Sequence, residues 1–288
     1  MNIPIEILEI IIDYLDNETK LKFINSKCII PKLIKSVHID NMLNINKNPF
    51  ENIKKFSNLK KISCSDTNIE SLSGIQIFNK LQNIDCSNSK IYSLSEIENF
   101  INLKVLNCSK IKIYSLKYIT KCINLQVLIC NNTNISSLEG IENLTKLREL
   151  KCSFTSINSL KEIKNHSNLQ ILNFSSTNIS SLEDIKNLVN LKNLIFHKTN
   201  INSLLDIYNL KNLQKLCCSY TKINSLNGIQ NLFNLKNLDC SNTNITSLKG
   251  IEKLNNLQIL SCINTKINSF DEINNINKYN KNFYIFFY

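Results

Sequence analysis

Cysteines recur along the chain at a fixed interval, and they are the residues with the most obvious capacity for chemistry. The 288 residues include 11 cysteines, and those with shared neighbours are Cys64, Cys86, Cys108, Cys130, Cys152, Cys218, Cys240 and Cys262. A thiolate can bind a metal ion, attack an electrophile or oxidise to a disulfide. The sequence has no C-x-x-C pair and no cluster of cysteine with histidine, so the spacing of a zinc site is missing. We therefore expect no bound metal ion.

Other residues that commonly catalyse reactions are also isolated. The three histidines are His38, His166 and His197, and none of them stands in a recognisable Ser-His-Asp or Cys-His pattern. The glycine-rich patterns that bind phosphate groups, G-x-x-x-x-G-K-[ST] and G-x-G-x-x-G, do not occur. We therefore expect a protein that is not an enzyme and that binds no cofactor.

A leucine that recurs every 22 residues explains the spacing of the cysteines. It falls at residues 59, 81, 103, 125, 147, 169, 191, 213, 235 and 257. With this leucine as position 1, position 4 is Leu or Ile, positions 11 and 17 are Ile, and position 14 is Leu except at Phe270. Position 6 is cysteine except at Phe174 and Phe196. Ten units without an insertion predict a solenoid, in which each unit stacks on its neighbours.

Each unit is predicted to form one short strand and one short helical turn. Positions 4 and 6 are apolar between polar positions 3, 5 and 7, which indicates a strand with one buried face, and such strands should stack in parallel. Position 13 is always Ser and position 16 is often acidic, which predicts a capping box, or a near relative of it, that starts a helical turn at position 14. Apolar positions 14, 17 and 20 are three apart, as in a 3₁₀ helix.

The cysteine at position 6 therefore belongs to the apolar core. Phe174 and Phe196 take the same position, so the site requires apolar volume and not a thiol. Parallel strands lie about 4.8 Å apart, whereas the Cβ atoms of a disulfide lie about 3.8 Å apart. We expect reduced thiols, with Cys217 at outward position 5 as the reactive exception. His166, at position 20, is interpreted as a core or edge histidine.

The unit LxxLxCSxTxIxSLxxIxxL resembles the leucine-rich repeat in its short form of 22 residues. The resemblance covers residues 59–278 and implies an α/β repeat solenoid, an arc with a parallel β-sheet on its concave face and 3₁₀ or helical turns on its convex face. Two departures stand out, because the third Leu is Cys or Phe and the usual Asn at position 9 is Thr, Ser89 or Ile111. A hydroxyl offers fewer hydrogen bonds than an amide, so we expect a weaker side-chain ladder after each strand.

Residues 1–40 do not fit the repeat and predict a small helical module. Pro4 suits a first helical turn, and apolar residues at helical spacing follow it. The sequence IPIEILEIIIDYLDNETKLKFINSK resembles the start of an F-box, the helical motif that docks onto the Skp1 adaptor of cullin-RING ubiquitin ligases. The residues that this resemblance assigns to Skp1 binding are Pro4, Ile7, Leu8, Ile11, Leu15 and Leu21. The alternative is a helical cap that only shields the first repeat.

The remaining ranges complete a two-module organisation. Residues 41–58 are expected to form a junction and N-terminal cap, residues 59–278 the ten repeats, and residues 279–288 a C-terminal cap strand rich in aromatic side chains. An F-box followed by leucine-rich repeats is a known combination in eukaryotes and in large DNA viruses of eukaryotic hosts. It implies a substrate-recognition subunit of an SCF-type E3 ubiquitin ligase, with the head on Skp1 and the repeats on a target protein.

Two other functions stay open. One is a plain protein-interaction scaffold in which the head acts only as a cap. The other, which we favour least, is nucleic-acid binding, since the net charge is +11 and phosphate binding needs such charge. Position 2 carries a cation on alternate repeats, at Lys60, Lys104, Arg148, Lys192 and Lys236.

The target protein is expected on the concave face, where positions 3, 5 and 8 project outward. Most of these residues are polar, but the third to seventh repeats place apolar residues there, namely Val105, Val127, Ile129, Phe154, Ile171 and Ile195. An exposed apolar cluster beside a few charges, here Glu149 and Lys151, is typical of a protein-binding patch. The alternative is that β-branched residues serve strand propensity.

The two ends of the sequence predict an intracellular protein. The first residues lack the positive segment of a secretory signal, and no run approaches the roughly 18 to 20 apolar residues of a membrane helix. We therefore expect a monomer in the reducing cytoplasm or nucleus, not secreted and not bound to membranes.

Overall fold

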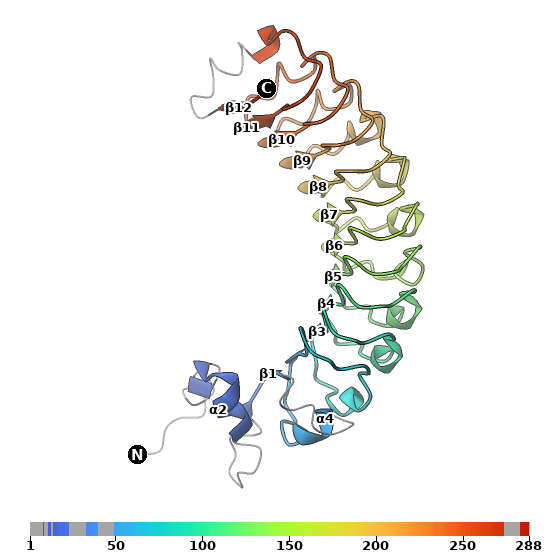
Figure 1. Ribbon diagram of the computed structural model, residues 1–288, viewed down its shortest axis with the longest axis vertical. Coiled ribbons are helices and arrows are strands. Elements are labelled where there is room, and N and C mark those ends of the chain that lie inside the picture. The colour runs from blue at the N-terminus through green and yellow to red at the C-terminus, as the bar shows by residue number, and fades with distance from the viewer. Residues whose placement is uncertain are drawn as a thin grey trace.

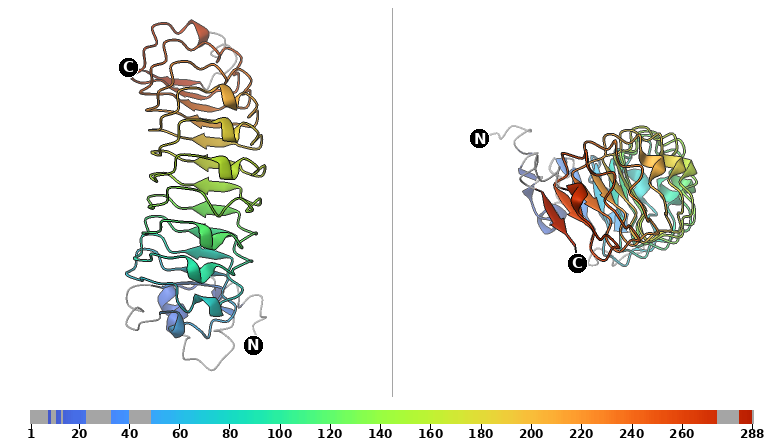
Figure 2. Two further views of the ribbon diagram at one scale, coloured as in Figure 1. Left: turned by 90° about the vertical axis from the view of Figure 1, so that its right-hand side faces the viewer. Right: turned by 90° about the horizontal axis from the view of Figure 1, so that it is seen from above.

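The repeats stack into a single arc. The computed structural model describes residues 8, 11–12, 14–22, 33–39, 49–273 and 283–287. The strands line the concave side of the arc and the helical turns line its convex side (Figure 1). Two further views show the repeats stacked as a ladder and, seen from above, overlapping but displaced along the curve of the arc (Figure 2). The predicted α/β repeat solenoid is confirmed.

Each repeat contributes one strand of three residues, and two further strands extend the sheet beyond the repeats. All neighbouring strands are parallel, and their order in the sheet is their order in the chain. The strands are β1 (Ser36–His38), β2 (Lys61–Ser63), β3 (Asn83–Asp85), β4 (Val105–Asn107), β5 (Val127–Ile129), β6 (Glu149–Lys151), β7 (Ile171–Asn173), β8 (Asn193–Ile195), β9 (Lys215–Cys217), β10 (Asn237–Asp239), β11 (Ile259–Ser261) and β12 (Tyr284–Phe286). The sheet thus begins before residue 59, within the range predicted to be helical.

Hydrogen bonds between repeats continue beyond the short strands. The N–H of Cys86 at position 6 donates to the carbonyl oxygen of Asn107 at 2.8 Å, and the N–H of Asn88 at position 8 donates to that of Ser109 at 2.8 Å. Equivalent bonds recur between the other repeats. Because they join neighbouring repeats, each repeat depends on the next for its backbone partners.

The core lies between the sheet and the convex turns. The side chains at positions 4 and 6 are buried along the whole series, whereas those at positions 3 and 5 are half-buried or exposed. The strand register predicted from the alternating pattern is confirmed. All ten described cysteines are free and nine of them are buried. Phe174 and Phe196 fill the gap in the cysteine row, with stacked rings 5.6 Å apart.

The chain leaves each strand through a left-handed residue at position 8. These ten residues have φ between 52° and 58°, although none is glycine: Asp66, Asn88, Lys110, Asn132, Phe154, Ser176, Lys198, Tyr220, Asn242 and Asn264. At position 9 the hydroxyl closes the same turn, as when Thr155 Oγ1 donates to the carbonyl oxygen of Cys152 at 2.7 Å. The bond lies within one repeat, so threonine here closes a turn and does not form the expected ladder between repeats.

Short 3₁₀ helices line the convex side in seven places. They are η2 (Ile75–Ile77), η3 (Ser95–Ile97), η4 (Lys117–Ile119), η5 (Lys161–Ile163), η6 (Glu183–Ile185), η7 (Leu205–Ile207) and η8 (Asp271–Ile273). The helices η3 to η8 start at position 15, one residue later than predicted, and η2 starts at position 17. The serine at position 13 accepts a hydrogen bond from the N–H two residues on, as in Ser181 with Glu183 at 3.1 Å.

The full capping box is wrong, because the acid at position 16 bonds to another repeat, whereas the serine alone caps the turn as a near relative of that motif. Ser71 Oγ donates to Glu96 Oε1 at 3.2 Å, and Ser247 Oγ donates to Glu272 Oε1 at 2.8 Å. Each pair is 25 residues apart. The serine and the acid therefore join neighbouring convex turns, and the acid does not cap the turn of its own repeat.

An asparagine ladder at position 22 gives further contacts between repeats. Asn190 Nδ2 donates to the carbonyl oxygen of Ser167 at 2.8 Å, and Asn212 Nδ2 donates to that of Val189 at 2.9 Å. Where position 22 is Lys146, its amino group donates to Asn124 Oδ1 at 2.6 Å. The asparagine that precedes most of the register leucines is thus a structural residue that the sequence pattern displays.

The N-terminal module packs onto the first strands of the sheet. Helix α2 (Asn17–Lys22) belongs to this module, and α4 (Pro49–Asn52) lies between β1 and β2 in the predicted junction. Ile12 is buried, and Leu8 and Leu15 pack against the same apolar core as the repeats. None of the helices in the described part of the chain combines the length and apolar character needed to cross a bilayer.

Candidate functional site

The concave sheet brings together only part of the predicted target-binding residues. Val105 and Val127 are paired on the adjacent strands β4 and β5, and Ile129 on β5 lies between Asn107 on β4 and Lys151 on β6. All three apolar side chains are half-buried on the face turned away from the core. They form one apolar group on β4 and β5.

A charged strand separates this group from the other predicted residues. Lys151 Nζ lies 2.6 Å from Glu149 Oε1, and both side chains are on β6. Beyond them, Ile171 pairs with Asn193, and Ile195 pairs with Asn173. The two isoleucines are therefore diagonal to each other, and each lies beside a polar residue.

Phe154 lies at the margin of the concave face and not on a strand. It occupies the left-handed turn after β6 with φ of 56°, and 52% of its surface is exposed. Lys198 and Tyr220 occupy the same position 8 in later repeats, and Lys198 Nζ lies 5.4 Å from the centre of the Tyr220 ring. Because its side chain is exposed at this margin, Phe154 is available to a partner that covers the edge of the sheet.

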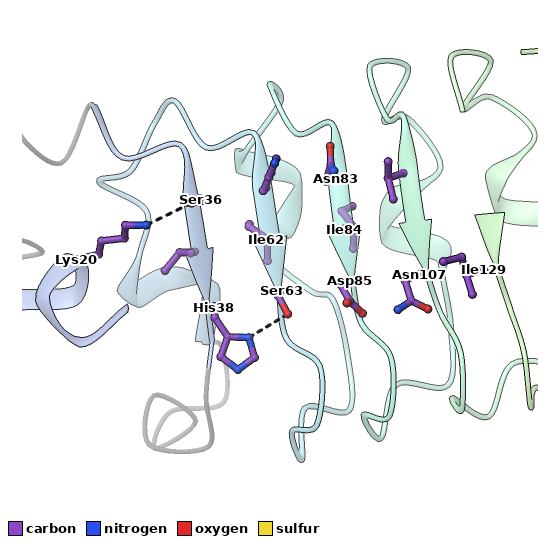
Figure 3. A pocket seen from close by; sticks show the side chains of 13 residues that line it. Lys20, Ser36, His38, Ile62, Ser63, Asn83, Ile84, Asp85, Asn107 and Ile129 are labelled. Atoms are coloured by element: carbon purple, nitrogen blue, oxygen red, sulfur yellow. Dashed lines mark hydrogen bonds between the residues drawn. The ribbon is translucent and has the colours of Figure 1, made fainter. Parts of the chain in front are cut away.

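A pocket of about 520 Å³ opens on the concave face between α2 and the first five strands. We call it the N-terminal cup, and its lining is Lys20, Ser36, Val37, His38, Lys61, Ile62, Ser63, Asn83, Ile84, Asp85, Val105, Asn107 and Ile129. Figure 3 shows Lys20 reaching from α2 towards Ser36, and the other labelled side chains spread over β1 to β5. Val105 and Ile129 make the predicted apolar group one wall of this cup.

Hydrogen bonds hold the polar side of the cup in place. Lys20 is 7% exposed, and its Nζ donates to Ser36 Oγ at 3.4 Å. His38 Nδ1 and Ser63 Oγ are 3.0 Å apart. Asp85 Oδ1 accepts from the N–H of Ser87 at 3.0 Å and from its hydroxyl at 2.7 Å. The polar groups of the cup are therefore preorganised by contacts within and between strands.

Charges on the concave strands are balanced. At positions 3 and 5 of the repeats the cations are Lys61, Lys151 and Lys215, and the anions are Asp85, Glu149 and Asp239. The cations at position 2, from Lys60 to Lys236, are exposed and precede the strands. The chain as a whole is positively charged, but the charges at positions 3 and 5 of the concave strands therefore cancel.

A second polar group lies farther along the same face. Cys217 Sγ donates to Asp239 Oδ2 at 3.3 Å and lies 3.6 Å from Ser219 Oγ. Burial raises the pKa of the Cys217 thiol, and the nearby Asp239 charge raises it further. A raised pKa opposes thiolate formation, so this group lacks an activated nucleophile. No set of three metal-ligating side chains occurs in the described ranges.

The residues assigned to Skp1 by resemblance do not form one exposed surface. Leu8 and Leu15 pack against the core, whereas Ile11 is 46% exposed. Pro4, Ile7 and the side chain of Leu21 lie outside the described residues. Of the described members, Ile11 is thus the one that is available to a partner.

Sequence reasoning missed the polar half of the cup. Lys20, Ser36 and His38 precede the first repeat, so no repeat position marked them. Lys61 and Asn83 occupy position 3, and Asp85 occupies position 5. The strand register had therefore placed these three side chains on the concave face, but it had not marked them as part of a site.

Comparison with known proteins identifies the repeat and the fold. The family model described as Leucine Rich repeats (2 copies) matches residues 123–165, within the repeats, and gives no support to an F-box. No curated protein sequence matches the chain. The repeats are leucine-rich repeats, and the chain folds as their solenoid.

Solved structures with the same fold include bacterial proteins. The crystal structure of an internalin (inlF) from Listeria monocytogenes has 17% identity and a TM-score of 0.71, with 93% of each chain covered. A leucine-rich-repeat protein from Leptospira interrogans has 28% identity and a TM-score of 0.75, over 82% of this chain and 62% of its own.

The functional domain of InlJ from Listeria monocytogenes is also similar, and it is described as including a cysteine ladder. It has 24% identity and a TM-score of 0.75, over 89% of this chain and 53% of its own. Identity at this level shows a shared fold and leaves the partner of this chain open.

Proposed function

We propose that this protein is a non-enzymatic scaffold that binds a partner protein on the concave face of its leucine-rich repeats. The observation that carries the proposal is the half-buried apolar group Val105, Val127 and Ile129 on adjacent concave strands. Solenoids present extended concave surfaces of this kind to their partners. Apolar side chains with polar neighbours suit a protein interface.

The backbone conformation at Phe154 supports the same proposal. A left-handed φ costs an aromatic residue more than asparagine, which stands at this position in four other repeats. An exposed phenylalanine held in an unfavourable conformation indicates selection for contact and not for folding. Such an aromatic side chain is a candidate hot spot.

The balance of charge favours a protein partner over nucleic acid. Binding to phosphates requires a surplus of cations on the contacted surface. Lys61 and Asp85 lie on neighbouring strands of the face, and Lys151 is paired with Glu149. The concave strands therefore offer no continuous basic track.

A photo-crosslinking experiment tests the proposal. Benzoylphenylalanine would replace Val127 on the concave face or Lys164 on the convex face, in the full chain expressed in its source cells. We expect one partner protein to be cross-linked at position 127 and not at position 164. Cross-links from position 164 alone would contradict a concave interface.

A pair of substitutions then tests the apolar residues. The variant Phe154→Ala with Ile129→Asp should weaken partner binding by roughly 2 kcal/mol or more if Phe154 is a hot spot. Both side chains lie outside the core, so the unfolding midpoint should change little. Unfolding of the variant at the temperature where the wild type is folded would show that these side chains support the fold instead.

The adaptor function is a second candidate, and it rests on the head. Ile11 is 46% exposed and Tyr14 is 87% exposed, so an apolar surface remains on this module. In this function the head would bind a Skp1-like adaptor in the cytoplasm or nucleus, and the concave face would hold the target of an SCF-type ligase. The packing of Leu8, Ile12 and Leu15 against the core favours the alternative in which the head only shields the first repeat.

Binding to purified Skp1 separates the two functions of the head. In the adaptor function the full chain binds Skp1, and Ile11→Lys abolishes binding because a charge would be buried against an apolar partner. Glu18→Lys, at an exposed site on α2, serves as the control. Absence of Skp1 binding by the wild-type chain would leave the head as a cap.

A further inference from the structure

We propose that the N-terminal cup binds an extended acidic segment of the partner, with a carboxylate at Lys61 and Asn83 and an apolar side chain on Val105 and Ile129. This inference rests on the proposed binding function of the concave face. It adds the chemistry of the bound segment and its position on the sheet.

The geometry limits how a segment can lie in the cup. α2 closes the N-terminal end through the bond from Lys20 to Ser36, and the strands run side by side from β1 to β5 (Figure 3). A cavity of about 520 Å³ accommodates a few side chains but not a folded domain. The occupant should therefore be a short stretch of chain that crosses the strands.

One row of side chains in the cup consists of hydrogen-bond donors. Ser36, Lys61 and Asn83 are aligned on successive strands, because Ser36 pairs with Lys61 and Lys61 pairs with Asn83. Their hydroxyl, ammonium and amide groups can all donate to a carboxylate. Lysine and amide donors that lie side by side on a sheet are suited to an anionic group.

The charges of the cup also favour an anionic ligand. Lys20 and Lys61 contribute two positive charges, and Asp85 contributes one negative charge. Oδ1 of Asp85 is already engaged by two bonds from Ser87. The donor row is thus on the positive side of the cup, and an acidic segment complements it.

An apolar wall continues the row at a defined distance. Val105 follows Asn83 on the next strand, and Ile129 lies beside Asn107. Lys61 and Val105 are two strands apart, which corresponds to about 9.6 Å. In a polyproline II segment, residues i and i+3 share one side and are about 9.3 Å apart. The spacing therefore favours an acid and a large apolar residue three positions apart.

Selection from a library of random decapeptides displayed on phage tests this inference on the full chain. We expect enriched peptides to share Asp or Glu and a large apolar residue three positions apart. A fluorescent consensus peptide should then bind the wild type, and Lys61→Glu should weaken binding by at least about tenfold.

Matched variants separate the cup from the rest of the face. Lys215 is also an exposed lysine at position 3, so Lys215→Glu should leave the affinity unchanged. Val105→Ser should weaken binding by about tenfold, whereas Ile259→Ser at position 3 of the last repeat should not. Equal unfolding midpoints would exclude a general loss of fold.

The inference is overturned if no motif or a basic motif is enriched, or if Lys215→Glu weakens binding as much as Lys61→Glu. Failure of the proposed function looks different, because it would remove cross-linking at position 127. Persistent cross-linking there without peptide selection would refute the cup as the binding site and retain the concave face.

Discussion

Cys217 and Asp239 lie on adjacent concave strands, and the thiol of Cys217 donates a hydrogen bond to Asp239 Oδ2 at 3.3 Å. Burial, and then the negative charge of Asp239, raise the pKa of this thiol. Of the ten described cysteines, Cys217 is the one that is not buried. The accessibility of Cys217 therefore favours its reaction with a reagent, whereas its raised pKa disfavours the reactive thiolate.

The first prediction concerns the order in which the thiols react. With iodoacetamide at pH 8, Cys217 should be modified before the other described cysteines, but more slowly than cysteine in an unstructured peptide. Asp239→Asn should accelerate the modification, because it removes the charge that disfavours the thiolate. Asp85→Asn, at the same position of another repeat, is the control, and peptide mass spectrometry provides the rates. An unchanged rate in Asp239→Asn would contradict the role of this charge.

The second prediction concerns alkaline unfolding. Burial raises the pKa of Cys64 and Cys152 from 9.0 to about 12, and the other buried thiols shift in the same direction. Above pH 9 the unfolded chain releases protons that the folded chain retains, so stability is fully present below pH 9 and falls as the pH rises. Each buried thiol should lower the free energy of unfolding by up to about 1.4 kcal/mol per pH unit.

Urea unfolding with reductant between pH 7 and pH 10 measures this loss. Because nine cysteines are buried, the fall should be much steeper than for a protein of equal size with few thiols. Replacing Cys130 by Val should reduce the slope above pH 9 by up to about 1.4 kcal/mol per pH unit. An identical slope in Cys130→Val would exclude the thiols as the cause.

The third prediction concerns acid. His166 is fully buried, its Nε2 lies 3.0 Å from the carbonyl oxygen of Ile141, and its Nδ1 has no hydrogen-bond partner among the described residues. Burial lowers the pKa of His166 below 6.5. The unfolded chain therefore takes up the proton first, and stability that is complete above pH 6.5 is lost as the pH falls towards the folded pKa.

The variant His166→Leu should remove this part of the acid dependence. Leucine stands at position 20 in several other repeats and leaves no buried polar atom. Thermal unfolding between pH 5 and pH 7.5 should show a smaller slope for the variant than for the wild type. Part of any acid loss that remains would come from His197, whose pKa is also lowered by burial.

The spacing of Leu59, Cys64 and their equivalents was sufficient to predict the solenoid. A period of 22 with an alternating strand allows only one side of each strand to be buried, so the register followed directly. The partner of Glu96 was not predictable in the same way. A capping box and a bond to the preceding repeat use the same residue types, and only the stacking distance between turns selects the second.

The candidate site was predictable only in part, for a related physical reason. Val105, Val127 and Ile129 were found because the strand register alone places them together. The N-terminal cup was missed because α2 and β1 enclose it, and neither belongs to the periodic pattern. Lys20 and Ser36 are brought together by the packing of the head, which no local sequence rule describes.

The fourth prediction uses two glycines with the same conformation. Gly228 and Gly250 have φ of 114° and 110°, so alanine would experience similar backbone strain at both. A Cβ at Gly228 would lie 2.1 Å from the carbonyl oxygen of Leu204, but one at Gly250 would lie 3.4 Å from that of Leu226. Gly228→Ala should therefore destabilise the fold clearly more than Gly250→Ala in urea unfolding. Equal losses would show that the convex turns shift to accept the extra carbon.

The fifth prediction separates stability from binding at Phe154. Its φ of 56° is costly for an aromatic residue and tolerated by asparagine. Because 52% of its surface is exposed, Phe154→Asn should lose little packing and raise the free energy of unfolding by about 1 kcal/mol. Tyr220→Asn should gain less, since Lys198 lies over that ring at 5.4 Å.

The same variant should weaken capture of the partner cross-linked at position 127. Higher stability with lower binding is the combination expected when a strained residue is retained for contact. Urea unfolding and cross-linking yield, measured on one preparation, provide both quantities. If Phe154→Asn loses stability instead, packing at the edge of the sheet outweighs the backbone strain, and Phe154 is retained for the fold.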